Sequence, residues 1–487
     1  MNSLLNLQPQ IVWDYFSQIC TIPHPSGHES KLIDYILTIV AENNLEHKQD
    51  DVGNLYIKKP PTKGFYNKKT VALQAHLDMV PQKSTTSSHN FHTDKIETFV
   101  KDGWVTANET TLGADNGIGL AACLAVMTSN NIDHGPLEFL FTVNEEAGMT
   151  GAHNLNPKFL DADILLNTDS EQEGDIFVGC AGGSDCKINI NIERESIENN
   201  TLKFIELSLS KLKGGHSGAN INDNRGNAIQ LLNDFLLNNI DLFNGRIVDI
   251  KGGSLRNAIP RESSVYLGYS EEHAQLLFDC INTFRDALKL QLSQDDQEFE
   301  IHLEERPKVK SVLTKESQIK LLNLINAYPN GVQKMSSKFD GVVESSLNLG
   351  VIHSTESNIE LLFLIRSLNE SGIRRIKSNL SSISKLASVD AMFSGDYPGW
   401  DPDPKSKIAK IFNDTYFEIY QKEPKLMVIH AGLECGLFKK PYPNLDMISF
   451  GPTIKNPHSP GEKVEIKSVE LFWQQLTAIL KRIPEKL

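Results

Sequence analysis

The sequence lacks the cysteine patterns that mark redox and cysteine-cluster proteins. It has no CxxC pair, and its six cysteines are scattered at Cys20, Cys123, Cys180, Cys186, Cys280 and Cys435. Scattered cysteines are typical of buried free thiols in a reducing compartment. We therefore expect structural cysteines rather than a redox site or a metal cluster built on thiolates.

Long apolar runs and excess positive charge are also missing. No segment approaches the roughly 18 uninterrupted apolar residues of a membrane span, and the N-terminus has neither the basic region nor the cleavage site of a secretory signal. The chain has 48 Lys+Arg against 62 Asp+Glu, a formal charge of -14. This charge repels polyanions, so nucleic acid and membrane are disfavoured as partners. We expect a cytoplasmic protein.

What is present is the composition of a folded protein, with 40% apolar and 23% charged residues in 487 positions. This length predicts two or three domains. Strand and helix signals alternate up to residue 183 and again from residue 396, which predicts an α/β fold with a mostly parallel sheet. The first domain is therefore formed by residues 1–183 and 396–487.

Residues 184–395 have a different pattern, in which half-exposed strands alternate with helices. We predict an inserted α+β domain of two βαββαβ-like units, the second of which begins at the helix "SQIKLLNLINAY". The segment "GDYPGWDPDPKSK" is rich in Pro, Gly and Asp and marks the end of the insertion.

Polar side chains gather at the ends of the apolar strands of the first domain. The motifs "AHLD", "TLGADNG", "TVNEEAG", "NTDSEQEG" and "NPHSPGE" contain His76, Asp78, Asp115, Glu145, Glu146, Asp169 and His458. Each motif alone has an ordinary explanation, such as a turn, a helix cap or an exposed loop. In parallel sheets, however, ligands bind beyond the carboxyl ends of the strands. Two histidines with several carboxylates form the ligand set of a dinuclear zinc, cobalt or manganese site.

Such a site suits the hydrolysis of amide bonds. Two metals activate a water and polarise the carbonyl group, and a free carboxylate collects the proton. The five motifs resemble those of the dizinc metallopeptidases of the aminoacylase and carboxypeptidase G type, and the resemblance extends over nearly the whole chain. It implies a catalytic domain formed by the first domain, with the insertion as a lid that also mediates dimerisation.

The resemblance also implies roles for individual residues. Two Zn²⁺ per chain are expected, with Co²⁺ or Mn²⁺ as substitutes. One metal is bound by His76, Asp169 and Asp115, and the other by Glu146, His458 and the shared Asp115. Asp78 orients the ring of His76, and Glu145 is the general base. A cis peptide bond is expected between Asp115 and Asn116.

In the insertion, the resemblance points to residues that contact the substrate. His216 in "KGGHSGANI" stabilises the oxyanion, in similar proteins often from the partner subunit of a homodimer. Asn257 and Arg366 bind near the terminal carboxylate, for which the planar fork of arginine is suited. Gly432, with His430 and Glu434 nearby, lines the cleft. The alternatives are an exposed loop histidine for His216 and structural roles for Asn257 and Arg366.

Within this family the chain is most similar to the enzymes that cleave Xaa-His dipeptides, including β-alanyl-histidine. The alternatives keep the metals and change the substrate: a tripeptide aminopeptidase, a broad dipeptidase or an N-acyl-amino-acid deacylase. A non-catalytic scaffold predicts the loss of a ligand or of the base. Glu145 and all five expected ligands are present, which disfavours that alternative.

Overall fold

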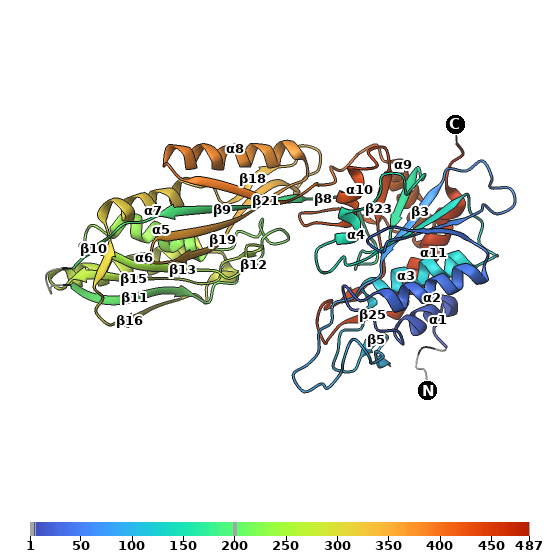
Figure 1. Cartoon of the computed structure of the whole chain (residues 1–487), viewed down its shortest axis with the longest axis horizontal. Helices are drawn as coiled ribbons and strands as arrows, with labels where there is room; N and C mark the ends of the chain where they lie inside the picture. The colour runs from blue at the N-terminus through green and yellow to red at the C-terminus, as the bar shows by residue number, and fades with distance from the viewer. Residues whose placement is uncertain (1–3, 5, 198–201, 487) are drawn as a thin grey trace. The chain divides into compact units, whose positions relative to one another are not determined.

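The chain folds into two compact units in this computed structural model, which describes residue 4 and residues 6–197 and 202–486. Unit 1 comprises Met1–Cys180, Pro402–Val428 and Leu433–Leu487, and unit 2 comprises Ala181–Asp401 and Ile429–Gly432. The colours of Figure 1 show that unit 1 combines both ends of the chain, in blue, cyan and red, whereas unit 2 is green to orange. Unit 2 is therefore an insertion in the chain of unit 1.

An eight-stranded sheet forms the centre of unit 1, in the order β1-β2-β6-β3-β7-β23-β8-β22. The strands are β1 (Glu46–Gln49), β2 (Leu55–Lys59), β3 (Val71–His76), β6 (Leu137–Thr142), β7 (Ile164–Asn167), β8 (Asp175–Cys180), β22 (Lys425–Ile429) and β23 (Asp446–Ser449). The central strands β6, β3, β7 and β23 are parallel, whereas the pairs β1–β2, β2–β6 and β23–β8 are antiparallel. The predicted α/β fold is confirmed, with a parallel centre and antiparallel edges.

The central strands β3, β6 and β7 are buried along their whole length. In β3 (VALQAH) and β6 (LEFLFT) every residue is buried, as expected for parallel strands with both faces covered. One core contains residues of this sheet and of its helices, namely α1 (Gln10–Ile19), α2 (Ser30–Glu42), α3 (Ala114–Thr128), α9 (Lys407–Tyr420) and α11 (Ile466–Arg482). The segment 8–45 has a helical pattern but forms two helices, because "TIPHPSG" between them contains two prolines.

A small four-stranded sheet completes unit 1. Its order is β24-β25-β5-β4. The strands are β24 (Ile454–Lys455), β25 (Lys463–Glu465), β5 (Trp104–Ala107) and β4 (Thr98–Lys101). β24 and β25 form a hairpin close to the C-terminus, and β25 pairs with β5 from the N-terminal part. This sheet therefore joins the first and the last chain segments of unit 1.

Unit 2 contains a nine-stranded sheet in the order β16-β11-β15-β13-β19-β20-β9-β21, with β18 paired to β19. The strands are β9 (Gly182–Asn191), β11 (Leu202–Ser210), β13 (Arg246–Gly252), β15 (Ser263–Ser270), β16 (Glu300–Glu305), β18 (Gly331–Met335), β19 (Val343–Ser354), β20 (Asn358–Ser367) and β21 (Asp390–Tyr397). Its neighbours run antiparallel. Two short pairs, β10 (Arg194–Ser196) with β17 (Ser311–Leu313) and β12 (Gly215–His216) with β14 (Ala258–Ile259), lie outside this sheet.

The four long helices of unit 2 share one core with its sheet. They are α5 (Ala228–Asn239), α6 (Ala274–Gln291), α7 (Lys315–Ala327) and α8 (Glu370–Leu386). Buried and half-buried residues alternate along β9 and β11, which is the pattern of an antiparallel sheet with one face on a core. In the part of the chain that the structure describes, no helix is long and apolar enough to span a membrane.

The sheet of unit 2 is built from two βαββαβ units. The first is β11-α5-β13-β15-α6-β16 and the second is β9-α7-β19-β20-α8-β21, and in both the spatial order of the strands is fourth, first, third, second. The two units meet where β13 pairs with β19. The prediction of two such units is confirmed, with one correction. The second unit does not begin at its helix, because its first strand is β9, which precedes the first unit in the chain.

Candidate metal centre

The predicted metal ligands lie at the carboxyl ends of the central parallel strands. His76 is the last residue of β3, Glu145 and Glu146 follow β6, and Asp169 follows β7. Two further side chains come from other elements: Asp115 from the first turn of α3, and His458 from the loop between β24 and β25. Because parallel strands end at the same edge of a sheet, residues far apart in the sequence are brought together there.

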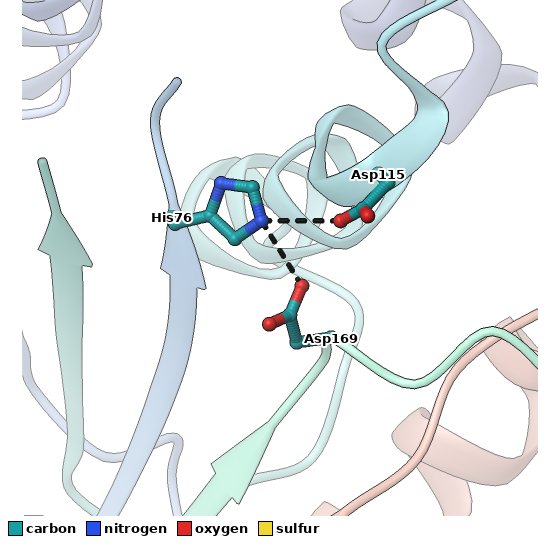
Figure 2. Close-up of side chains that lie close together, drawn as sticks. All are labelled: His76, Asp115 and Asp169. Atoms are coloured by element: carbon teal, nitrogen blue, oxygen red, sulfur yellow. Dashed lines mark hydrogen bonds and ion pairs between the residues drawn. The ribbon is translucent and has the colours of Figure 1, made fainter. Parts of the chain in front are cut away.

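His76 faces two carboxylates (Figure 2). Its Nε2 lies 3.1 Å from Oδ1 of Asp115 and 3.2 Å from Oδ1 of Asp169. Its Nδ1 lies 3.0 Å from the backbone carbonyl oxygen of Asp78. A carbonyl oxygen only accepts, so Nδ1 carries the hydrogen and the lone pair of the neutral ring is on Nε2. Three acceptor atoms therefore point toward one another, an arrangement that suits metal ligands.

His458 makes a second group of the same kind. Its Nε2 lies 3.3 Å from Oδ2 of Asp115 and 3.1 Å from Oε2 of Glu146. Asp115 thus turns one carboxylate oxygen toward each histidine, as a bridging ligand would. The peptide bond between Asp115 and Asn116 is cis, as the resemblance implies.

Buried oxygens without partners also fit a metal pair. Oε1 of Glu146 is buried and has no hydrogen-bond partner, and Oδ1 of Asp169 is buried and faces Nε2 of His76 without a hydrogen between them. Three groups of potential ligand atoms lie within 4.8 Å of one another: His76, Asp115 and Asp169; His76, Glu145 and Glu146; and Asp115, Glu146 and His458. Nitrogen and carboxylate donors in these numbers match two divalent metals. The residues present therefore fit the two zinc ions that the resemblance implies.

The charges of this cluster are strongly perturbed. Burial disfavours the charged form of His76, but Asp169, Asp115 and Asp78 outweigh it and raise its pKa well above the usual value. Burial raises the pKa of Asp169 to about 7, against the opposing effect of His76. Burial also raises the pKa of Glu145 well above its ordinary value. A cluster with such an excess of carboxylates favours bound cations.

Asp78 fixes the turn that holds Glu145 and Glu146. Its Oδ1 accepts from the backbone N–H of Glu145 at 2.8 Å, and its Oδ2 accepts from that of Glu146 at 3.1 Å and from Oγ of Ser26 at 2.7 Å. Its Oδ1 is 3.5 Å from Nδ1 of His76. Asp78 therefore contacts both the His76 ring and the backbone of the two glutamates.

In unit 2 the structure brings His216 close to Arg366. Nδ1 of His216 accepts from the backbone N–H groups of Gly218 at 3.3 Å and Ala219 at 3.0 Å. In a neutral imidazole the hydrogen is then on Nε2, and burial, with Arg366, lowers the pKa of His216 to about 4. Nε2 is 3.2 Å from Nη2 of Arg366. The Nε2–H of His216 and the guanidinium of Arg366 are both donors and cannot bond to each other. An anionic oxygen between them could accept from both.

The segment Ile429–Gly432 packs against the loop of His216. A Cβ atom on Gly218 would lie 2.0 Å from the carbonyl oxygen of His430, so only glycine permits this contact. Nε2 of His430 is 2.8 Å from Oγ of Ser346. Asn257 joins the same region through its backbone carbonyl, which accepts from the N–H of Ser217 at 2.9 Å. His430 is thus placed beside the loop of His216 within unit 2.

Glu434 lies in unit 1 beneath the strand ends that carry the candidate ligands, and the sequence pattern assigns it no individual role. It is 1% exposed, and its Oε2 accepts from Nε2 of Gln74 at 2.6 Å and from Oγ1 of Thr142 at 2.9 Å. Gln74 also binds the side chain of Asn167. Glu434 thus ties together the ends of β3, β6 and β7. The sequence signal that could have pointed to Glu434 is its partner Gln74, a polar residue inside the apolar run "VALQAH".

The sequence and the structure were compared with those of known proteins, and similar proteins were found over nearly the whole chain. Residues 72–482 match the family model of Peptidase family M20/M25/M40. The chain is 47% identical over 486 residues to the cytosol non-specific dipeptidase of Escherichia coli (strain K12), with 100% of both chains covered. The crystal structure of aminoacylhistidine dipeptidase from Vibrio alginolyticus matches with a TM-score of 0.94 and 49% identity over 99% of each chain. Aminopeptidase PepT from Bacillus cereus, at 15% identity and a TM-score of 0.57 over 98% of this chain and 99% of its own, shares the fold.

Proposed function

The chain belongs to Peptidase family M20/M25/M40, and we propose that it is a cytoplasmic dinuclear metallodipeptidase that cleaves Xaa-His dipeptides, including β-alanyl-histidine. The observation that carries the proposal is the placement of Asp115 between His76 and His458, with one oxygen toward each. The names of the two full-length relatives support a dipeptide substrate. As the resemblance implies, we propose a homodimer.

Two divalent metals, zinc with cobalt or manganese as substitutes, would be held by the ligand set named above with Asp115 shared. When bound, they would supply an activated water and a polarised carbonyl group. The protein's own contribution is to hold these ligands at the edge of the sheet. Asp78 supports them by fixing both the ring of His76 and the Glu145–Glu146 turn.

Glu145 is the proposed general base. It takes a proton from the attacking water as the new C–O bond forms, and gives that proton to the leaving nitrogen as the C–N bond breaks. Burial raises the pKa of Glu145 above its ordinary value, and a carboxyl pKa closer to neutral suits a group that first accepts a proton and then donates it. Glu146 next to it remains a ligand.

His216 and Arg366 are proposed to bind the substrate. The Nε2–H of His216 donates to the oxygen that becomes negative when the carbonyl is attacked. The Arg366 guanidinium binds the terminal carboxylate, and Asn257 and Gly432, both in unit 2, are proposed to line the same part of the substrate site. The two donors lie 3.2 Å apart, which supports the binding of an anionic part of the substrate near them.

The second candidate is a broad dipeptidase, which the name of the Escherichia coli relative favours. A panel of Xaa-His and Xaa-Leu dipeptides, with N-acetyl analogues, separates the two. Release confined to free dipeptides that end in histidine supports the first proposal. Equal cleavage of Xaa-Leu keeps the dipeptidase and overturns the preference for histidine. Cleavage of the N-acetyl analogues indicates a deacylase instead.

A further inference from the structure

Glu462, the last residue of "NPHSPGE", is a buried carboxylate that binds four consecutive backbone N–H groups. Its side chain is in unit 1, and the residue is 2% exposed. Oε2 accepts from Leu112 at 2.7 Å and Gly113 at 3.0 Å, and Oε1 accepts from Ala114 at 2.7 Å and Asp115 at 3.2 Å. These groups belong to the segment that leads into α3 and ends at the proposed bridging ligand.

His458 lies in the loop that connects the two strands of the β24–β25 hairpin. This loop runs from β24 to β25, and Glu462 is its last residue before β25. The His458 side chain is 49% exposed, so burial does not hold it in place. Glu462 is fixed by its own backbone, because its N–H donates to the carbonyl oxygen of Ser459 at 3.0 Å and its carbonyl oxygen accepts from Oγ1 of Thr106 at 2.8 Å.

We infer that Glu462 is a positioning residue that sets the separation of Asp115 and His458. Its backbone ends the loop that presents one ligand, and its side chain holds the backbone that presents the other. It does not touch the proposed metals itself. The inference rests on the proposed function, because the two side chains need a fixed separation only if they bind a common metal.

The chemistry of the contact requires a carboxylate. A carboxylate has two accepting oxygens, and each oxygen of Glu462 accepts two N–H groups. A glutamine has one accepting oxygen, and its NH₂ group would face two of the backbone donors. Glu462→Gln therefore keeps the size of the side chain but removes half of the clamp.

A matched control separates positioning from the general effect of losing a helix cap. Oδ2 of Asp446 accepts from the backbone N–H groups of Lys407 at 2.9 Å and Ile408 at 3.1 Å, at the start of α9. Asp446 is the first residue of β23, at the opposite end of that strand from the metal-binding edge. Asp446→Asn thus damages a similar clamp in the same unit without touching a proposed ligand.

The test is the titration of chelator-stripped protein with Co²⁺, followed by the visible absorption of the bound ion. We expect wild type and Asp446→Asn to bind two equivalents alike. In Glu462→Gln one of the two should bind about 10–100-fold more weakly, as is typical when a residue that supports a ligand is lost. Circular dichroism shows whether both variants are folded. Thermal unfolding shows whether Asp446→Asn and Glu462→Gln lose a similar amount of stability.

Binding of both ions by Glu462→Gln as in wild type would overturn the inference and leave Glu462 as a helix cap. If Glu462→Gln does not fold, Glu462→Asp keeps the charge on a shorter side chain. A wild-type Co²⁺ isotherm for Glu462→Asp would overturn the inference, and weakened binding of one ion would support it. Wild-type protein that binds no Co²⁺ would overturn the proposed function itself, and the inference with it.

Discussion

Asp115 is the residue on which the candidate site depends most. Each of its oxygens faces a histidine nitrogen, and each histidine also faces a second carboxylate. Without cations this arrangement places acceptor atoms and negative charges against one another in a largely buried position. Two bound cations would offset these charges and would be held by these same residues. Asp115 thus links the two halves of the site.

The roles of the adjacent residues Glu145 and Glu146 can be separated by substitution. Glu145→Ala should bind both metals but lower kcat by about 10²–10⁴-fold, because only the proton transfer is removed. Glu146→Ala should instead lose one metal. Metal content and kcat of the two variants check this prediction. Loss of metal in Glu145→Ala would mean that the two residues exchange roles, which the shared ligand group of His76, Glu145 and Glu146 allows.

His216 should act mainly in the transition state. Its Nε2–H donates to an oxygen that carries full negative charge only after the attack, so His216→Ala should lower kcat by about 10²-fold with a smaller change in KM. His302→Ala is the control, because His302 is an exposed histidine on β16 of the same unit. A kcat of His216→Ala equal to that of wild type would show that His216 does not stabilise the transition state.

At the scale of elements, the central parallel strands determine where the site lies. The sequence predicts this because three of the five ligand motifs directly follow an apolar run, and these runs, which become β3, β6 and β7, read as buried strands. The sequence does not predict the roles of Glu434 and Glu462. Their partners are Gln74 and the backbone of Leu112–Asp115, about 350 residues away in the chain, and such contacts follow no local pattern.

The start of α5 provides a test of local stability in unit 2. The side-chain oxygen of Asn227 accepts from the N–H groups of Ile229 and Gln230, and its amide donates to the carbonyl oxygen of Leu349 at 2.9 Å. Asn227→Ala should therefore lower the free energy of unfolding of unit 2 by about 1–2 kcal/mol. Urea denaturation checks this value. A variant as stable as wild type would show that the cap contributes nothing.

At the scale of the whole molecule, the insertion was readable from composition and pattern, but the pairing of its strands was not. β9 is hydrogen-bonded to β20 and β21, with Gly182 opposite Ser367. Between β9 and these partners lies the entire first βαββαβ unit. Because antiparallel pairing over such a separation leaves no periodic signal, the sequence does not show that β9 is the first strand of the second unit.

Metal binding should stabilise the folded protein. A ligand that binds only the native state at about 100 times its Kd adds about 2.7 kcal/mol. Chelation should therefore lower the unfolding temperature of wild type, and zinc should restore it. Asp115→Asn should lose most of this zinc-dependent gain, because Asp115 is shared by both proposed ions. Differential scanning calorimetry with and without zinc measures the effect, and an equal gain in Asp115→Asn would contradict the bridging role.

The most direct measurement combines metal content and activity in one preparation. Chelator-stripped protein is titrated with zinc while bound metal and the hydrolysis of β-alanyl-histidine are followed together. The proposed function predicts no hydrolysis without metal, and full activity when two zinc ions are bound per chain. Hydrolysis that persists in metal-free protein would contradict the assignment of a dinuclear metallodipeptidase. So would the absence of hydrolysis of every dipeptide tested when two zinc ions are bound to the protein.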